Sequence, residues 1–376
     1  MSKAAELANL IGNINMGGGG VNRNVIINGA MNVCQRNVSA TGLGGNADSY
    51  HTVDRFKLGA EGTTAGRLTM SQDSSAPEGF ANSLKLACTT ADTSIGSAEL
   101  LTLAHIIEGQ NLQTFAKGTS SAKPYAVSFY VKGNASATYV CELFDGDNSR
   151  HVAKTFSVTT DWTRVELSFP ADTTGAFDDD ANASLYLQIF LHAGSNFSSG
   201  TLPATWASKT NANRATGGSS FFDSTDRTFF ITGVQLEVGQ NPTEFEHEPF
   251  ERTLAKCQRY LQVFGGDSNQ VAGWGMTRAA NNNFVSFPLV KALRATPTVS
   301  VQGGTVRFTA EGAQTEGSSN TIVINSVTPS VVYGNNSSNV VTLRYDGDTG
   351  PDTTINSQTI GFMVNDNVEI LFESEL

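Results

Sequence analysis

The chain has 376 residues, of which 39% are hydrophobic and 16% charged, and its formal net charge is −11. Soluble domains usually carry about 25% charged residues, so this chain is rich in uncharged polar residues, and its recurring Val, Ile, Phe and Thr argue against intrinsic disorder. Residues 295–376 hold nine acidic and two basic residues, and without a basic patch the composition excludes a nucleic-acid-binding protein.

The sequence lacks the segments that direct a chain to a membrane. It does not begin with a basic stretch followed by an apolar run, so we expect no signal peptide. No apolar run reaches the roughly 18 residues of a membrane helix, so we expect no membrane insertion. These patterns predict a protein that is made in a cytoplasm. The cysteines lie too far apart for a CxxC motif and are expected to be buried free thiols; they are Cys34, Cys88, Cys141 and Cys257.

A short helix is predicted at the N-terminus, over residues 1–13. Ser2 is a candidate N-cap, and Leu7, Leu10 and Ile11 share one helix face. Four glycines at 17–20 follow, which is typical of a flexible joint. We interpret residues 1–23 as an attachment segment with these three apolar residues as its anchor. A frayed terminus is the alternative.

Residues 24–245 are predicted to form a β domain. Residues 24–36 indicate a strand, a turn and a second strand, and residues 50–56 close this opening unit. From there to 239, apolar and polar residues alternate with the period of half-buried strands. The many short strands with polar turns favour an antiparallel jelly-roll β-sandwich. The strongest runs lie at 84–88, 127–131, 165–169, 185–191 and 229–236.

The last of these runs carries specific expectations. Gly233 is expected at a β-bulge. Val234 and Leu236 are expected to face the core, and Gln235 and Glu237 to face outward or towards a neighbouring molecule.

A connecting helix is predicted over residues 246–262. Pro249 suits the first turn, and Phe250, Leu254, Cys257 and Leu261 would lie on one face. Residues 263–376 return to strand patterns and are predicted to form a second β-sandwich. Its predicted strands are 284–290, 298–301, 305–309, 321–327, 340–345, 360–364 and 368–372.

No motif in the sequence indicates an active site. The histidines are scattered singly, and neither HExxH nor GxSxG is present, so we expect no enzyme and no cofactor. The acidic turns at 145–148 and 346–352 offer hard oxygen ligands that suit calcium. Asp-Gly is also a frequent hairpin turn, and we favour plain turns there.

Exposed aromatic residues are the candidates for ligand binding, because sugars stack on aromatic rings while amides bind their hydroxyl groups. The three tryptophans are Trp162, Trp206 and Trp274. Trp274 lies between glycines, near Asn281, Asn282 and Asn283, and these four residues form a candidate sugar site. A core or inter-subunit position for Trp274 is the alternative.

Two motifs resemble bacteriophage tail-fibre and virion structural proteins. The opening motif is Asn24-x-Ile-Ile-Asn-Gly-Ala-Met-x-Val-x-Gln-Arg36 with Asp54-Arg-Phe56. The closing motif is Gly233-Val-Gln-Leu-Glu-Val-Gly239, then Thr243-x-Phe-Glu246 and Cys257-Gln-Arg-Tyr260. The N-terminal residues also resemble the start of marine phage structural proteins.

The resemblance implies a carbohydrate-binding-module-like jelly roll followed by a trimerising or receptor-binding β domain. It implies a homotrimeric tail fibre in the virion, bound to other virion proteins through its N-terminus and to host-surface glycan. A head fibre or decoration protein on the capsid, a virion-associated polysaccharide depolymerase, and a cellular carbohydrate-binding module remain as alternatives.

Overall fold

The computed structural model describes residues 2–15, 22–265, 270–279, 282–302, 306–309, 321–324, 330–333, 340–346, 359–364 and 369–376. The chain divides into two compact units. The first comprises Met1–Thr253 with Leu376, and the second comprises Leu254–Glu375.

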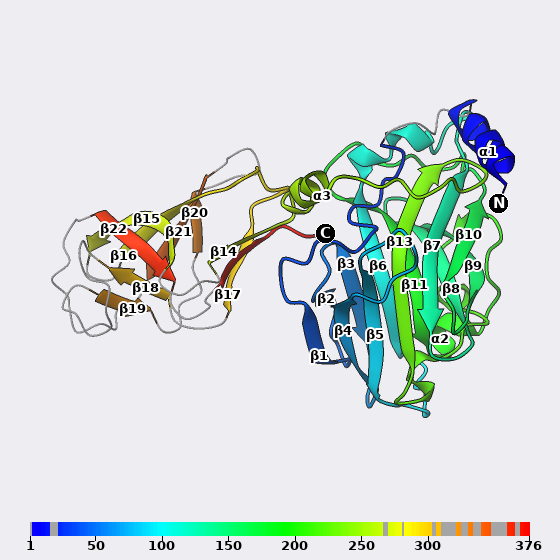
Figure 1. Ribbon diagram of the computed structural model, residues 1–376, viewed down its shortest axis with the longest axis horizontal. Coiled ribbons are helices and arrows are strands. Elements are labelled where there is room, and N and C mark those ends of the chain that lie inside the picture. The colour runs from blue at the N-terminus through cyan, green and yellow to red at the C-terminus, as the bar shows by residue number, and fades with distance from the viewer. Residues whose placement is uncertain are drawn as a thin grey trace. The chain divides into compact units, whose positions relative to one another are not determined.

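The first unit is a sandwich of two antiparallel sheets (Figure 1). Sheet A has the order β1 (Ser39–Leu43), β4 (Arg67–Asp73), β5 (Ser83–Thr90), β13 (Thr228–Val238), β7 (Tyr125–Gly133), β10 (Thr163–Phe169). Sheet B has the order β12 (Ala207–Ser208), β9 (Arg150–Val158), β8 (Ala137–Asp145), β11 (Ala183–Ala193), β6 (Leu100–Glu108), β3 (Phe56–Glu61), β2 (Ser49–Tyr50).

The chain crosses repeatedly from one sheet to the other. From β5 in sheet A it passes to β6 in sheet B and back to β7 in sheet A, and from β9 in sheet B to β10 in sheet A. This connectivity is that of a jelly-roll sandwich, and it confirms the predicted all-β fold class. Short helical turns occupy the connections: η1 (Gly109–Asn111), η2 (Gln113–Phe115), α2 (Ser195–Ser198), η3 (Asn211–Asn213) and η4 (Phe221–Asp223).

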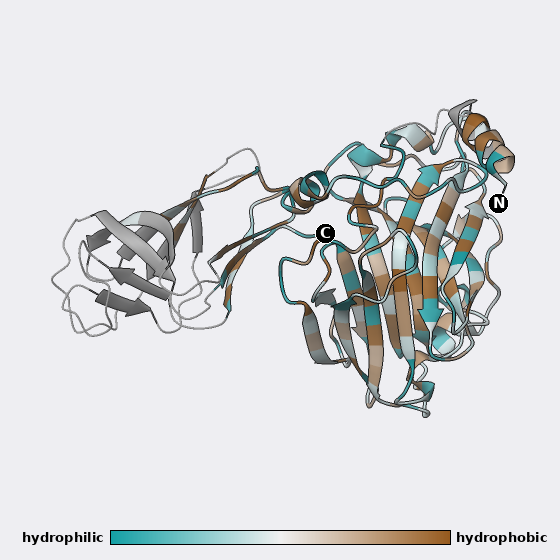
Figure 2. Ribbon diagram, viewed as in Figure 1, coloured by the Kyte–Doolittle hydropathy of each residue, from teal (hydrophilic) through white to brown (hydrophobic). Residues whose placement is uncertain are grey.

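The core lies between the two sheets, and the alternation of side chains along each strand builds it. On β7, Val127, Phe129 and Val131 are fully buried in the core, and on β13 Phe229 and Ile231 are too. The residues between them point to the outer face of sheet A. Figure 2 shows the resulting alternation of hydrophobic and hydrophilic residues along the strands. The predicted strands of this region are therefore confirmed.

The second unit is also built of antiparallel strands. Its described strands form one sheet of β14 (Leu261–Gly265), β23 (Glu369–Glu373) and β17 (Thr298–Gln302). Another sheet has the order β19 (Thr321–Ile324), β18 (Val306–Thr309), β22 (Thr359–Val364), β15 (Gln270–Ala279), β16 (Asn282–Pro288), β21 (Val340–Asp346), β20 (Ser330–Tyr333). The sequence pattern did not predict β14, β15 or β20.

The N-terminal helix α1 spans Lys3–Asn15, two residues beyond the predicted end. Ser2 caps it, since its Oγ accepts the Ala5 N–H at 3.3 Å. Leu7 and Ile11 are 56% and 50% exposed, and Leu10 is half-buried. The tetraglycine at 17–20 lies outside the described residues. The apolar face of α1 is therefore available to a partner.

The connecting helix α3 spans only Phe250–Cys257, so the prediction of a helix over 246–262 was too long. Leu261 begins β14, where it pairs with Glu373 of β23, and Phe250 is 54% exposed. The spacing of Leu261 fits a helix and a strand equally well, and pairing with a strand distant in sequence decided the outcome.

Candidate functional site

The predicted sugar site around Trp274 falls where side chains are not described. Trp274 lies on β15, and Asn282 and Asn283 lie on β16, where Asn283 pairs with Thr277 of β15. Asn281 and the side chains of the other three residues lie outside the described part. This site therefore stays a prediction.

The other two tryptophans are less exposed than predicted. Trp206 is only 8% exposed, and its Nε1 donates to the Pro170 carbonyl at 2.8 Å, so it is a core residue and not an exposed binding residue. Trp162 is half-buried at the turn between β9 and β10, with its ring 6.1 Å from that of Phe230.

The opening and closing motifs, about 200 residues apart in sequence, pack against each other. Residues 22–29, which we call the strap, run along the part of β13 that β5 does not reach, because β5 pairs only with Thr228–Ile231. Val25 donates its N–H to the Leu236 carbonyl at 3.0 Å, and the Val234 N–H donates to the Gly29 carbonyl at 2.9 Å. The strap thus covers an edge that would otherwise leave backbone groups unpaired.

The strap is not the regular strand that its sequence predicts. Within the described residues 22–36 the chain forms turns and irregular structure without a β-ladder. Asn24 makes strand-like bonds with its side chain: its Nδ2 donates to the Val234 carbonyl at 3.2 Å, and its Oδ1 accepts the Leu236 N–H at 3.1 Å. Side-chain amides of this kind compete with regular backbone pairing, which explains the difference.

Gln235 and Glu237 were predicted to face outward or towards a neighbouring molecule, but they are fully buried and are covered by the chain itself. They do point away from the core, and Gly233, at φ +62°, forms the predicted bulge. The strap and residues 243–246 cover them. The Gln235 Oε1 accepts the Glu246 N–H at 2.8 Å, and its Nε2 donates to Glu237 at 3.0 Å.

Glu237 binds groups from the strap and from the closing motif. Its carboxylate accepts the Thr243 N–H at 2.7 Å and the Thr243 hydroxyl at 2.8 Å, and it lies 3.4 Å from the Arg23 Nε. Burial raises the pKa of the Glu237 carboxyl, against the opposing effect of Thr243 and Arg23. We call the contacts of Arg23, Asn24, Gln235, Glu237, Thr243 and Glu246 the clasp. The clasp joins both motifs, and its buried carboxylate is hydrogen-bonded as buried charges require.

The rest of the opening motif forms a second buried polar cluster. Asn28 Nδ2 donates to the carbonyls of Val33 at 2.8 Å and Asp54 at 3.0 Å, and its Oδ1 accepts the Val33 N–H at 2.9 Å. The Asp54 carboxylate accepts the Gln35 N–H at 2.9 Å. These bonds explain why the motif pairs Asn28 and Gln35 with a distant Asp54.

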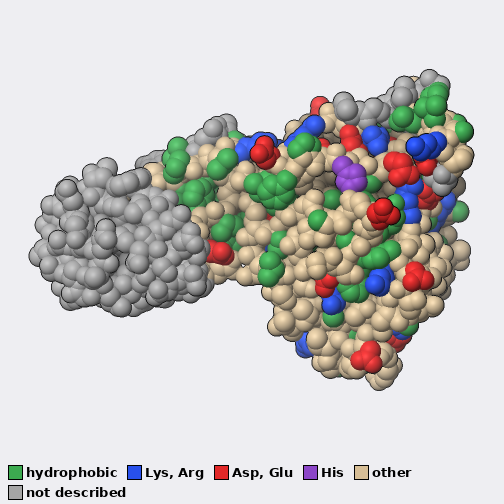
Figure 3. All heavy atoms as spheres, viewed as in Figure 1, with side chains coloured by type: hydrophobic (Ala, Val, Ile, Leu, Met, Phe, Trp, Pro, Cys, Tyr) green, Lys and Arg blue, Asp and Glu red, His purple; other side chains and the backbone are tan. Residues whose placement is uncertain are grey.

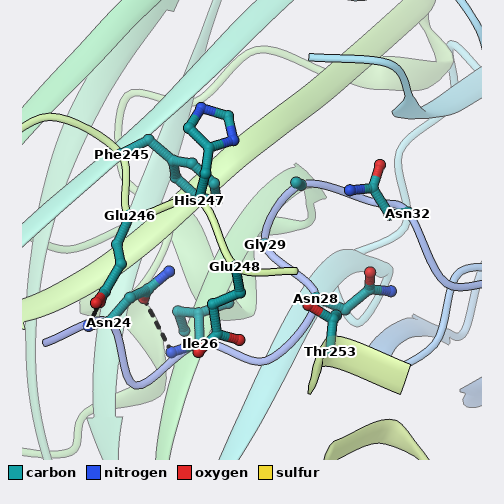
Figure 4. A pocket seen from close by; sticks show the side chains of 11 residues that line it. Asn24, Ile26, Asn28, Gly29, Asn32, Phe245, Glu246, His247, Glu248 and Thr253 are labelled. Carbon is teal, nitrogen blue, oxygen red and sulfur yellow. Dashed lines mark hydrogen bonds between the residues drawn. The ribbon is translucent and has the colours of Figure 1, made fainter. Parts of the chain in front are cut away.

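A small pocket lies between the strap and residues 245–253 (Figure 4). Its volume is about 30 Å³, which holds about two water molecules and cannot enclose a sugar ring. Amide and carboxylate groups dominate the lining; the labelled polar residues are Asn24, Asn28, Asn32, Glu246, His247, Glu248 and Thr253.

An aromatic cluster borders this pocket on the outer side of sheet A. The Phe80 ring lies 5.4 Å from Tyr130, 5.1 Å from Phe245 and 5.1 Å from His247. His247 is exposed and the other three are half-buried. We call Phe80, Tyr130, Phe245 and His247 the aromatic patch. Gly233 lies beneath it, and a Cβ there would come within 2.8 Å of Phe80.

A second aromatic group lies on the same face of sheet A. Phe230 on β13 is flanked in register by Lys85 of β5 and Lys132 of β7. The two Nζ atoms lie 5.2 Å and 5.9 Å from the ring centroid. Arg164, opposite Tyr130, pairs with Glu166 at 2.7 Å and Glu244 at 3.4 Å. Rings, ammonium groups and carboxylates thus share this face.

Charge does not dominate the face of the first unit that Figure 3 presents. Figure 3 shows acidic and basic side chains interspersed among uncharged groups on the face it presents. A surface of this kind suits an uncharged or weakly charged polar ligand better than a polyanion.

The acidic turn at 145–148 holds an ammonium group. Asp145 is fully buried, and its Oδ2 lies 2.6 Å from the Lys117 Nζ. The Asn148 N–H and side-chain amide both donate to the Asp145 carboxylate. The Lys117 ammonium group therefore occupies the place that a calcium ion would take at this turn. The other acidic turn, beyond Asp346 at the end of β21, lies outside the described residues.

Within the described ranges, no group of three or more His, Cys, Asp or Glu side chains is placed to hold a metal ion. None of the helices described here has the length and apolar character needed to cross a bilayer. The four cysteines are free; all but Cys34 are buried. Burial raises the pKa of Cys34 to about 12, which makes its thiol a poor nucleophile at neutral pH.

No protein-family model and no curated protein sequence matches the chain. Among solved structures, it is similar to CBM4 at 13% identity and a TM-score of 0.30, over 57% of this chain and 99% of that one. It is similar to a family 11 carbohydrate-binding module from Clostridium thermocellum, in complex with a β-1,3-1,4-mixed-linked tetrasaccharide. There the identity is 14% and the TM-score 0.26, over 56% of this chain and 99% of that one.

A third similar structure is the enzymatically active domain of tailspike protein 4 from bacteriophage CBA120. The identity is 11% and the TM-score 0.29, over 57% of this chain and 21% of that one. The jelly-roll assignment made above rests on the strand order of the two sheets and not on these similarities.

Proposed function

We propose that this protein is a virion surface protein, a homotrimeric tail fibre that binds host-surface glycan without cleaving it. The observation that carries the glycan-binding part is the aromatic patch on sheet A. Its four rings lie within 4.9 to 5.4 Å of a neighbouring ring and remain partly open to solvent. The virion part is supported by the opening and closing motifs, whose residues meet in the clasp and so belong to one module.

The chemistry of the patch suits a sugar. Aromatic rings offer a large apolar face at low conformational cost, and partly exposed rings of this kind mark ligand surfaces. Polar groups that can bind hydroxyls accompany the rings. Asn32 lines the pocket together with Phe245 and His247, and its side chain lies 3.2 Å from that of Asn82. Arg164 is the register partner of Tyr130. The surface is open, which fits a polysaccharide chain better than an enclosed small molecule.

Removing one ring from the patch is expected to weaken glycan binding. Tyr130→Ala and Phe80→Ala should each lower the affinity at least about tenfold, because truncated aromatic anchors usually cost this much at a binding surface. The affinity would be measured by calorimetry, with the ligand first chosen on an array of neutral and acidic oligosaccharides of two to six sugars.

Phe250→Ala is the matched control, since Phe250 is an exposed phenylalanine outside the patch. It should bind as the wild type does, and Tyr130→Phe, which keeps the ring, should retain most of the affinity. Equal binding by the wild type and by Tyr130→Ala would overturn the assignment of the patch. Release of reducing ends from the bound oligosaccharide would overturn the proposal that the protein does not cleave it and would favour a depolymerase.

Deleting residues 2–20 should abolish incorporation into virions, because the exposed face of Leu7 and Ile11 on α1 is then lost. The full chain should have three times the 39.8 kDa chain mass by light scattering, and the truncated protein should likewise have three times the mass of its own shorter chain. Normal incorporation of the truncated protein would contradict attachment through α1. Labelling of whole virions in the electron microscope separates a tail fibre from a head fibre.

A further inference from the structure

The clasp reaches directly into the aromatic patch. Glu246 stands between Phe245 and His247 in the chain, and both of these rings belong to the patch. The Glu246 N–H donates to the buried Gln235 at 2.8 Å. Its two carboxylate oxygens accept backbone N–H groups of the strap, from Asn22 at 2.6 Å and from Asn24 at 2.9 Å. One residue therefore connects the strap, β13 and two rings of the patch.

Hydrogen bonds as well as ring packing hold the segment that carries these two rings. Residues 245–248 line the pocket of about 30 Å³. The space beneath them is therefore polar and large enough for about two water molecules. Figure 4 shows the Glu246 side chain directed to Asn24, while Phe245 and His247 lie on the other side of this segment. A satisfied hydrogen-bond network rigidifies the groups that take part in it, so the bonds of Glu246 contribute to the orientation of this segment.

The strap end of the clasp is held by several further contacts. Arg23 donates to the Thr243 hydroxyl at 2.8 Å and to the Glu244 carbonyl at 2.6 Å. The Arg252 guanidinium donates to the Asn22 side chain. The strap is thus bound at Asn22 and Arg23 as well as at Asn24, and a displacement of the strap would be transmitted to Glu246.

We propose that Glu246 is a positioning residue for the glycan site: by accepting the two strap N–H groups, it holds Phe245 and His247 against Phe80. The N-terminal attachment segment, which leads into the strap, is thereby coupled to the glycan surface. This inference rests on the proposed function for its binding consequence. The positioning itself is a property of the chain and can be observed without a ligand.

A carboxylate is specifically required for this role. Two separate oxygens accept two separate backbone donors, and a charged acceptor strengthens both bonds. In Glu246→Gln, one oxygen becomes an NH2 group. This group is itself a hydrogen-bond donor and cannot accept a bond from a strap N–H. The substitution keeps size and shape, so it removes one strap bond with little change in packing.

The test compares Glu246→Gln with Glu251→Gln, an identical change at an exposed residue of α3. In Glu246→Gln we expect amide hydrogen exchange of Asn22 and Asn24 to accelerate at least about tenfold, and the His247 ring resonances to shift or broaden. Affinity for the longest array oligosaccharide should fall about fivefold or more, whereas a disaccharide should lose less. Glu251→Gln should match the wild type in each measurement.

The outcomes separate the two proposals. If the wild type binds no oligosaccharide but His247 still responds to Glu246→Gln, the proposed function fails and the positioning stands. If the Tyr130→Ala variant loses binding while Glu246→Gln changes neither His247 nor the affinity, the positioning role is overturned and the function stands. Equal melting temperatures of the two Gln variants show that a loss of fold is not the cause.

Discussion

Lys117→Ala should lower the free energy of unfolding by about 3–5 kcal/mol, the usual effect of breaking a buried ion pair from one side. The Lys117 side chain is 1% exposed, and its Nζ lies 2.6 Å from Asp145 and 3.2 Å from Asp172. It also donates to the carbonyls of Thr174 at 2.8 Å and Gly175 at 2.6 Å. Alanine would leave the buried Asp145 carboxylate without its cation, while Asp172 would keep its bond from Arg150 at 2.8 Å. Urea unfolding of the two proteins measures the difference.

The same four oxygens predict a rescue by calcium. They are hard oxygen ligands of the kind that calcium prefers, and they surround the place of the lost ammonium, so millimolar Ca²⁺ should restore part of the stability of Lys117→Ala. It should leave the melting temperature of the wild type unchanged, because the ammonium fills the site. Lys132→Ala, at a half-exposed lysine of β7, is the control and should change stability little. A stable Lys117→Ala protein, or a wild type that calcium stabilises, would contradict this view of the turn.

The contribution of Asp172 to the stability of the fold depends on pH in a definite direction. Burial raises the pKa of Asp172, but hydrogen bonds from Arg150 and Thr174 and the charge of Lys117 outweigh it, and the net pKa lies below the usual value of 3.8. A carboxyl with a lowered pKa in the folded state stabilises the fold above its unfolded pKa. This contribution should therefore be complete at neutral pH and be lost as the pH falls below about 4.

How much of the fold the sequence predicts depends on how local the deciding interactions are. The alternation at 127–131 and 229–231 is a property of the strand itself, so the strands and the sandwich were predicted correctly. The conformations of the strap and of Leu261 were not predicted correctly, because partners distant in sequence determine them. The strap pairs with β13, and Leu261 pairs with β23. The alternation of apolar and polar residues along a strand also shows only which face of the sheet each residue points to. It placed Gln235 and Glu237 on the outer side but could not show that residues 22–24 and 243–246 cover that side.

The aromatic patch was missed for the same reason. Phe80 comes from a loop, Tyr130 from β7, and Phe245 and His247 from the closing motif, and no spacing in the sequence brings these segments together. The alternation on β7 did signal that Tyr130 points away from the core between Phe129 and Val131. Ranking aromatic residues by their outward position in a strand, instead of choosing tryptophans, would have selected Tyr130 and Phe230.

Gly29→Ala should destabilise the first unit by about 3 kcal/mol, the upper part of the range for overpacking a buried site. A Cβ on Gly29 would lie 2.1 Å from the Val234 carbonyl oxygen and 3.3 Å from the Phe245 ring. The strap would have to move off β13, which would also break the bond from the Val234 N–H to the Gly29 carbonyl. Only glycine allows this approach of two backbones, which explains the Asn-Gly pair of the opening motif. Thermal and urea unfolding measure the change.

Gly12→Ala supplies the control, because a Cβ at that position of α1 meets nothing within 4 Å. Its free energy of unfolding should change by no more than about 1 kcal/mol, and in the stabilising direction, because alanine is favoured over glycine inside a helix. Because the new Cβ of Gly29→Ala also presses on Phe245, any folded Gly29→Ala protein should show altered Phe245 and His247 resonances, as Glu246→Gln should. Wild-type stability together with unchanged ring resonances would mean that the strap does not lie against β13 as described. The clasp would then lose its role in both stability and the placement of the glycan surface.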